Sequence, residues 1–310
     1  MKTDLDHLPE KQQRELQHVT DLLLNEFERA VAGGTQPWRQ KAKVLKIVLF
    51  GSYARNDWVD EPENGYQSDF DLLIVVNNDH LTDIADYWYV AEDKILRDIS
   101  VNRTVNIIVH SLSDVNRALS NGEYFWIDII REGISLHELP GHSFSTPEPS
   151  TPADAIKLAS DYFEKWSPGI ERRLTAFEME IGQAVIQKDP EWLKDGAFTL
   201  HQAVERAYAC FLLVRTLYFP RSHNIKFLRS LAEDKDKRLI EAWPRDSKID
   251  RRRFELLKRA YVDARYSDQF EISAEDLQAL MVSARRLRDI VREVSLERLA
   301  ILRAEAAEGA

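Results

Sequence analysis

The first half of the chain alternates short apolar runs with amphipathic segments. Apolar runs at residues 44–50, 70–76 and 104–109 predict buried strands, and a shorter run at 133–137 predicts a fourth. Apolar positions at helical spacing predict helices over residues 8–32, 82–98, 112–119 and 123–131. This alternation of strands and helices predicts an α/β domain over residues 1–140.

The second half is organised differently, with long amphipathic stretches and almost no strand signal. The spacing predicts helices over residues 153–188, 190–218, 224–233, 250–265 and 273–307. Ser273 with Asp276 three residues later resembles a capping box at the start of the last helix. We therefore expect an all-α bundle over residues 153–310.

Two segments are predicted to lack regular structure. Residues 141–152 form a linker, because prolines 147, 149 and 152 among Ser and Thr cannot continue a helix or strand. Residues 57–66 form an exposed loop, as their Pro, Gly and acidic residues indicate. Trp58 in this loop either stacks on a base or packs at the root of the loop.

The candidate chemistry lies around two of the predicted strands. The first strand leads into Gly51-Ser52, and the second opens with Asp69-Phe70-Asp71. Side chains alternate along a strand, so the two aspartates share a face. Two carboxylates this close repel each other unless a cation lies between them, and Mg²⁺ with a triphosphate is a natural partner. The amides and hydroxyl of the Gly-Ser turn can bind phosphate oxygens.

An apolar strand, Gly-Ser, Ala-Arg, a loop, Ser-Asp-x-Asp and a second apolar strand together resemble the polymerase-β-type nucleotidyltransferases, in particular the small "minimal" ones of prokaryotes. The resemblance implies a mixed sheet with helices, two Mg²⁺ ions and ATP as substrate. It assigns the metal to Asp69 and Asp71, and the nucleotide to Gly51, Ser52, Arg55 and Ser68. Arg55 alternatively pairs with an acid of the 57–63 loop.

The resemblance also implies a third carboxylate on the next strand, where this chain has Asn106. Asn cannot accept a proton, although its amide oxygen can bind a metal weakly. Three explanations are open: the enzyme uses two carboxylates and another base, the acid is Glu63, Asp128 or Glu132, or the domain binds nucleotide with little turnover. Loss of a general base typically costs ~10²–10⁴-fold in rate.

Residues 200–208, 221–228 and 260–266 resemble an HEPN domain, a helical bundle often found beside minimal nucleotidyltransferases. In some HEPN domains an Arg and a His separated by four to six residues cut RNA. Here Arg221 and Arg215 leave one and seven residues before His223, so neither fits. The region around His223 resembles a corner that opens a helix in this family, which implies a capping or corner histidine, with RNA cleavage as the alternative. Arg265 and Tyr266 are expected to close the bundle, with Arg265 paired to an acid and Tyr266 stacked in the core.

Composition narrows the function classes further. The formal net charge is −10, with 14 basic and 25 acidic residues in 1–150 but 14 basic and 8 acidic in 221–265. The basic segment suits RNA or nucleotide binding, and equally an attraction between the domains. The chain has no apolar run near the ~20 residues of a membrane span and no signal peptide, which predicts a cytoplasmic protein. Its one cysteine, Cys210, is expected to be buried and inert.

Three functions follow as hypotheses. The first is Mg-dependent transfer of AMP from ATP to a hydroxyl of a protein, RNA or small molecule held between the two domains. The second is a toxin–antitoxin or antiviral defence fusion in which the HEPN domain cleaves RNA and the transferase restrains it. The third is a nucleotide sensor without turnover. Analogy with HEPN bundles suggests a homodimer.

Overall fold

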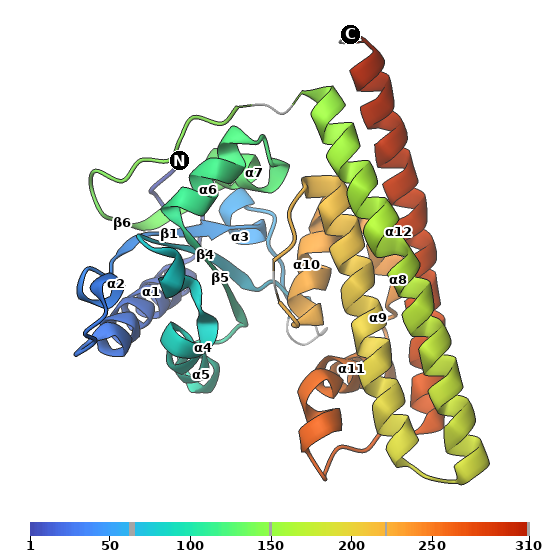
Figure 1. The fold of residues 1–310 in the computed structure, drawn as a ribbon. Coiled ribbons are helices and arrows are strands. Elements are labelled where there is room, and N and C mark those ends of the chain that lie inside the picture. Colours follow the sequence, from blue (N-terminus) through green and yellow to red (C-terminus); the bar gives the residue numbers. More distant parts are fainter. Residues whose placement is uncertain (62–65, 149–150, 221, 309–310) are drawn as a thin grey trace. The chain divides into compact units, whose positions relative to one another are not determined.

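The chain forms two compact units, Met1–Ser150 and Thr151–Ala310, in the computed structural model (Figure 1). The structure describes residues 1–61, 66–148, 151–220 and 222–308. The division falls within the predicted linker, of which residues 149 and 150 lie outside the described part.

The first unit is built on a mixed four-stranded sheet. In spatial order the strands are β5 (Val105–Ser111), β4 (Phe70–Val76), β1 (Val44–Phe50) and β6 (Ile134–Glu138). β1 is antiparallel to β4 and β6, whereas β4 and β5 are parallel. Every residue of β1 and β4 is buried, which explains why both strands are apolar apart from Lys46 and Asp71. The predicted α/β class is confirmed.

Helices cover both faces of this sheet (Figure 1). They are α1 (Glu10–Val31), α2 (Pro37–Gln40), α3 (Ser52–Arg55), α4 (Ile84–Tyr87), α5 (Tyr89–Arg97), α6 (Leu112–Ser120) and α7 (Tyr124–Glu132), with the 3₁₀ turn η2 (Asp79–Thr82). The apolar side chains of α1 and α5 share a core with Ile47 and Leu72 on one face. On the other face Phe125 of α7 packs edge-on against Phe50 of β1. The small hairpin β2 (Asp60–Glu61) and β3 (Tyr66–Gln67) was not predicted.

The predicted helical character of residues 82–98 is confirmed, although the segment divides into the end of η2, α4 and α5. The side chain of Asp83 accepts a hydrogen bond from the amide of Asp86 and so starts a new helix. Trp88 then interrupts it with a φ of −120°, and its indole donates to the carbonyl oxygen of Leu81. The apolar spacing was read correctly, but the breaks depend on these polar contacts.

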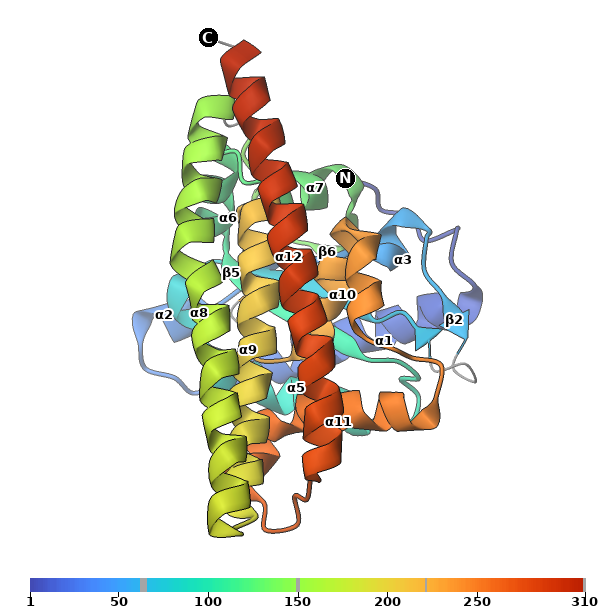
Figure 2. The same cartoon turned by 90° about the vertical axis from the view of Figure 1, so that its right-hand side faces the viewer.

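Within its described residues the second unit contains helices joined by short connections and no strand, as predicted. Its elements are α8 (Pro152–Gln187), α9 (Glu191–Thr216), α10 (Ile225–Lys235), the 3₁₀ segment η3 (Lys237–Ala242), α11 (Lys248–Tyr266) and α12 (Ala274–Glu308). Figure 2 shows α8, α9 and α12 side by side. α9 also packs against α10 and α11, and its residues 207–214 are all buried, as expected for a helix that is apolar on every side.

Side-chain caps fix where these helices begin. Thr151 caps α8, Ser247 caps α11, and the hydroxyl of Ser273 accepts from the amide of Asp276 at 3.0 Å. The last contact confirms the hydroxyl half of the predicted capping box.

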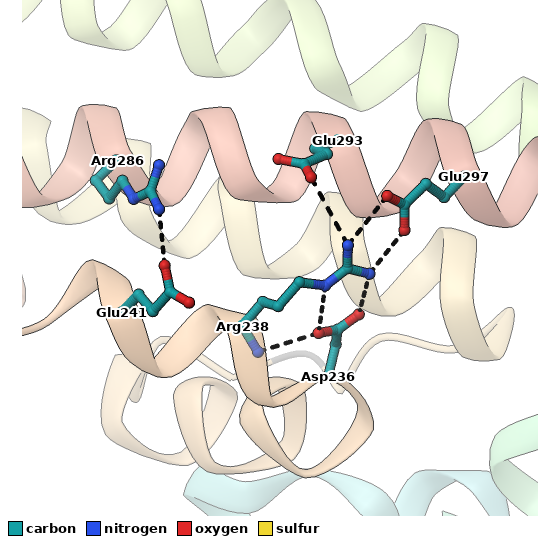
Figure 3. Close-up of polar contacts among 6 residues, drawn as sticks. All are labelled: Asp236, Arg238, Glu241, Arg286, Glu293 and Glu297. Atoms are coloured by element: carbon teal, nitrogen blue, oxygen red, sulfur yellow. Dashed lines mark hydrogen bonds and ion pairs between the residues drawn. The ribbon is translucent and has the colours of Figure 1, made fainter.

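Ion pairs hold η3 against α12 (Figure 3). The guanidinium of Arg238 contacts Asp236 at 2.8 Å, Glu297 at 2.7 Å and Glu293 at 3.8 Å. Arg286 of α12 pairs with Glu241 of η3 at 2.7 Å. Hydrogen bonds from Arg238 lower the pKa of Asp236 and of Glu297. The contacts to Arg238 therefore stabilise the unit only while these acids are ionised.

Two further properties of the chain follow from its helices. Within the described ranges none of them has the length and apolar character to cross a membrane. Cys210 is buried in α9, as predicted, and burial raises the pKa of its thiol to about 12, which disfavours the reactive thiolate.

Candidate active site

Two aspartates and an asparagine meet at one end of the sheet. Asp71 pairs in register with Asn106 across the parallel strands β4 and β5, and Asp69 lies two residues before Asp71 on the same face. The side-chain nitrogen of Asn106 donates to Asp71 Oδ1 at 2.9 Å and to Asp69 Oδ2 at 3.4 Å. All three side chains are buried, so the structure brings the predicted residues together.

The turn after β1 lies against this cluster. Gly51 has a φ of +76°, and a Cβ placed on it would lie 2.6 Å from Oδ2 of Asp71. Only glycine fits both the conformation and the close approach. Its carbonyl oxygen accepts from the amides of Ala54 and Arg55 at 3.1 and 3.2 Å, which forms the short helix α3 beginning at Ser52.

Arg55 ends this short helix and contacts two acids. Its guanidinium lies 3.4 Å from Asp57 and 3.8 Å from Glu132. The structure therefore contains the alternative contact, in which Arg55 pairs with an acid of the 57–63 loop. Arg131 pairs with both Glu132 and Asp128. Of the acids considered as a third carboxylate, Glu132 is thus connected to the turn through Arg55. Glu63 lies outside the described residues.

The loop between the two strands is anchored at its ends. The hydroxyl of Ser68 accepts from the amide of Val59 at 3.0 Å, and the amide of Ser68 donates to the carbonyl of Val59 at 2.8 Å. The ring of Trp58 stacks on Tyr53 at 5.3 Å with an interplanar angle of 7°. Trp58 therefore packs at the root of the loop, one of its two predicted roles.

A buried ion pair beside the site was missed from the sequence. Arg103 contacts Glu15 at 3.1 Å and donates to the hydroxyl of Tyr53. Burial lowers the pKa of Arg103, and Glu15 opposes this effect. A signal was present in α1, where Glu15 lies among the buried positions beside Leu16 and Val19, because a buried acid requires a cation.

The oxygen atoms of the cluster suit a divalent ion such as Mg²⁺. Mg²⁺ is usually bound by one or two carboxylates together with substrate phosphates and water, so two aspartates are enough. Asn106 can present its amide oxygen to the ion once its side-chain nitrogen no longer donates to the two aspartates. Across the residues with described placement, no three His, Cys, Asp or Glu side chains form a metal-binding group.

A second cluster of polar side chains lies in the helical unit. Nδ1 of His223 is 2.9 Å from Oε2 of Glu205, and its ring stacks on Tyr261 at 4.1 Å. The side chain of His223 is 56% exposed. Arg215 lies in the last turn of α9, and Arg221 is not among the described residues.

The predicted capping role of His223 is wrong, since Asn224 caps α10 by accepting from the amides of Lys226 and Phe227. The corner role is supported instead by the backbone. Nε2 of the buried His201 lies 3.1 Å from the carbonyl oxygen of His223, and Nδ1 lies 2.9 Å from that of Leu257. Burial lowers the pKa of His201.

Tyr266 is 75% exposed, so its predicted place in the core is wrong. It is the last residue of α11. The guanidinium carbon of Arg265 lies 4.6 Å from the ring centres of Tyr261 in the same helix and Phe198 in α9, and its Nε donates to the carbonyl oxygen of Tyr261. Within the described residues Arg265 thus contacts aromatic rings and a carbonyl in place of the expected acid.

Much of the basic segment 221–265 is engaged inside its own unit. Arg252 and Arg253 pair with Asp276, Arg245 pairs with Glu233, and Arg259 pairs with Asp263. These pairs reduce the positive charge available to an RNA or to another domain.

The fold and cluster of the first unit are those expected of a nucleotidyl-transferring enzyme. Residues 36–123 match the family model of the nucleotidyltransferase domain, and residues 183–294 match that of the HEPN domain. No curated protein matches the chain. The chain joins a nucleotidyltransferase domain to an HEPN domain, which confirms the combination inferred from its motifs.

Proposed function

We propose that the first unit transfers a nucleoside monophosphate, most simply AMP from Mg·ATP, to a hydroxyl acceptor. The observation that carries the proposal is the meeting of Asp69, Asp71 and Asn106 beside the glycine turn. The match to the nucleotidyltransferase domain supports the reaction class.

In this reaction the acceptor oxygen forms a bond to the α-phosphorus, and the bond between that phosphorus and the β-phosphate oxygen breaks. Pyrophosphate leaves, and the hydroxyl proton passes to a base. A bound divalent ion would supply positive charge to the α-phosphate and to the departing pyrophosphate. Asp69 and Asp71 hold that charge in place, while the Ser52 hydroxyl and the turn amides bind phosphate oxygens.

Arg55 can contribute to phosphate binding by exchanging its partners. Its pairs with Asp57 and Glu132 are 3.4 and 3.8 Å long, which is weak for a guanidinium–carboxylate contact. A triphosphate at the turn competes with these acids. Once its contact with Arg55 is broken, Glu132 is a candidate for the general base that accepts the hydroxyl proton. Asn106 cannot perform this role.

The test is incubation with each nucleoside triphosphate labelled at the α-phosphate, with Mg²⁺, and with or without RNA. We expect label from ATP on the protein, on RNA or on a small acceptor, and loss of labelling in Asp69→Asn/Asp71→Asn. Asp83→Asn is the matched control, because Asn caps a helix as well as Asp. Unchanged labelling in the double variant contradicts the proposal. Mg-dependent ATP binding without pyrophosphate release would instead support the hypothesis of a nucleotide sensor without turnover.

The His223 cluster favours a second function, cleavage of RNA by the helical unit. An exposed imidazole whose Nδ1 contacts a carboxylate and whose ring rests on a tyrosine is oriented for proton transfer. The test is RNA cleavage in EDTA by the full chain, by His223→Ala and by Glu205→Gln, with His142→Ala as control. Cleavage that survives His223→Ala counts against this function.

A further inference from the structure

Arg103 and Glu15 form an ion pair that is almost fully excluded from water. Their side chains are 1% and 2% exposed. Nη2 and Nε of Arg103 lie 3.1 and 3.2 Å from the same oxygen of Glu15, and the other oxygen of Glu15 accepts from the backbone amide of Asn102. The guanidinium is therefore fixed both to α1 and to the segment that leads into β5.

This guanidinium touches both elements that carry the candidate site. Its central carbon is 4.8 Å from the ring centre of Phe70, the residue between the two aspartates. It also donates to the hydroxyl of Tyr53, the residue after Ser52. The rings of Tyr53 and Phe70 are fully buried and meet edge to face at 4.6 Å. The guanidinium of Arg103 thus contacts both Tyr53, which follows the glycine turn, and Phe70, which lies on the strand that carries Asp71.

The same group reaches the loop that connects these elements. Nη2 of Arg103 lies 3.8 Å from Oδ2 of Asp60, at the start of the small hairpin. The carboxylate of Asp60 also accepts from Gln12 at 3.3 Å and from Gln67 at 2.8 Å. Gln67 immediately precedes Ser68, so the contacts extend to the entry of the aspartate strand.

Stability alone does not account for such an arrangement. A buried ion pair is a weak source of stability, and apolar side chains of similar volume often replace it without loss. A planar guanidinium differs from an apolar side chain because it fixes directions as well as filling space. Misplacement of reacting groups by about 1 Å can cost ~10²-fold in rate.

We propose that Arg103 is a positioning residue of the nucleotidyl-transfer site, which sets the placement of the Gly51-Ser52 turn relative to Asp69 and Asp71 through Tyr53 and Phe70. The inference rests on the proposed function. Arg103 acts through these two rings and touches neither nucleotide nor metal.

The test separates positioning from folding by removing both charges at once. Glu15→Leu/Arg103→Met keeps an apolar filling, so its melting temperature should stay near that of the natural chain, whereas Arg103→Met alone should melt lower. In the double variant we expect kcat to fall about 10–100-fold. Binding of Mn²⁺ in the presence of ATP, followed by electron paramagnetic resonance, should weaken in parallel.

The matched control is Lys46→Met/Glu138→Leu. This pair also contains a buried cation in the same sheet, but Lys46 lies four residues before Phe50, ~13 Å along the strand from the site. Its removal should leave kcat and Mn²⁺ binding unchanged.

A stable double variant with the natural kcat and Mn²⁺ binding overturns the inference and leaves the proposed function standing. A natural chain that neither binds Mn²⁺ with ATP nor transfers label overturns the proposed function itself. If the double variant does not fold, Tyr53→Phe and Arg103→Lys decide, because both keep the packing and lose the directed contact. Lower kcat in both supports positioning, and natural values in both overturn it.

Discussion

The side-chain nitrogen of Asn106 lies 2.9 Å from Oδ1 of Asp71, its register partner across the parallel strands β4 and β5. The amide N–H groups there donate hydrogen bonds to two carboxylates that are buried side by side. Asn106 therefore moderates the repulsion between the two aspartates. A third carboxylate in its place would add repulsion unless a metal were bound.

This reasoning predicts that Asn106→Asp makes the first unit depend on metal. Without Mg²⁺ the variant should lose about 3 kcal/mol or more of stability, the usual cost of an unpaired buried charge. Added Mg²⁺ should restore most of the lost melting temperature. The measurement is thermal unfolding with EDTA and with Mg²⁺. Asn121→Asp, at an exposed position, serves as the control. If Mg²⁺ does not change the melting temperature of Asn106→Asp, this explanation is wrong.

Gly51→Ala should impair the site beyond its backbone strain. The new Cβ would lie 2.6 Å from Oδ2 of Asp71, at a φ of +76°. Gly141→Ala is a matched control, because Gly141 has a φ of +87° but nothing within 4 Å of its added Cβ. Both should lose about 1–2 kcal/mol from the left-handed conformation. Nucleotide transfer should fall strongly in Gly51→Ala alone, and equal activities in the two variants would exclude the close approach as a cause.

His201 predicts a dependence of stability on pH in the helical unit. Burial lowers its pKa in the folded state, so the unfolded chain binds a proton more readily. Stability should be fully present above the ordinary pKa of 6.5 and should decrease as the pH falls below it. Chemical denaturation at pH 7.5 and pH 5.5 measures the difference. His201→Gln should reduce the slope with pH, and an unchanged slope in that variant contradicts the assignment.

The Arg238 contacts predict a loss of stability in acid. Arg238 lowers the pKa of Asp236 and the pKa of Glu297 from their ordinary values of 3.8 and 4.5. Their contribution is present above those values and is lost as the pH falls through the lowered ones. Arg238→Met should therefore melt lower than the natural chain at neutral pH but approach it in acid. Arg286→Met, which removes a single pair, should show a smaller difference, and equal melting of both variants would disprove the network.

Strands and long helices could be read from the sequence because their signals are local. The runs at 44–50 and 70–76 coincide with β1 and β4, since both strands are buried on both faces and bounded by polar residues. Residues 82–98 are helical as predicted, but the breaks within them could not be read, because they arise from the Asp83 cap and from Trp88. The prediction that Tyr266 lies in the core was wrong because apolar character at a helix end does not determine burial.

The residues that form the candidate site could be predicted from the sequence, whereas the contacts that hold these residues in place could not. Gly51, Asp69, Asp71 and Asn106 carry recognisable residue types at strand ends, where the register brings them together. The pairing of Glu15 with Arg103 joins residues 88 positions apart, and no local spacing encodes such a contact. In the same way, the partner of His223 became visible only when α9 and the start of α10 were placed together.

The parallel pairing of β4 with β5 has a consequence for how the enzyme is made. Parallel neighbours cannot be joined by a tight turn, so the chain must complete a helical crossover before Asn106 reaches Asp71, 35 residues away. Long-range pairing of this kind forms slowly compared with local helices. The pairing that brings Asn106 to Asp71 is therefore expected to form later in folding than the local helices around it.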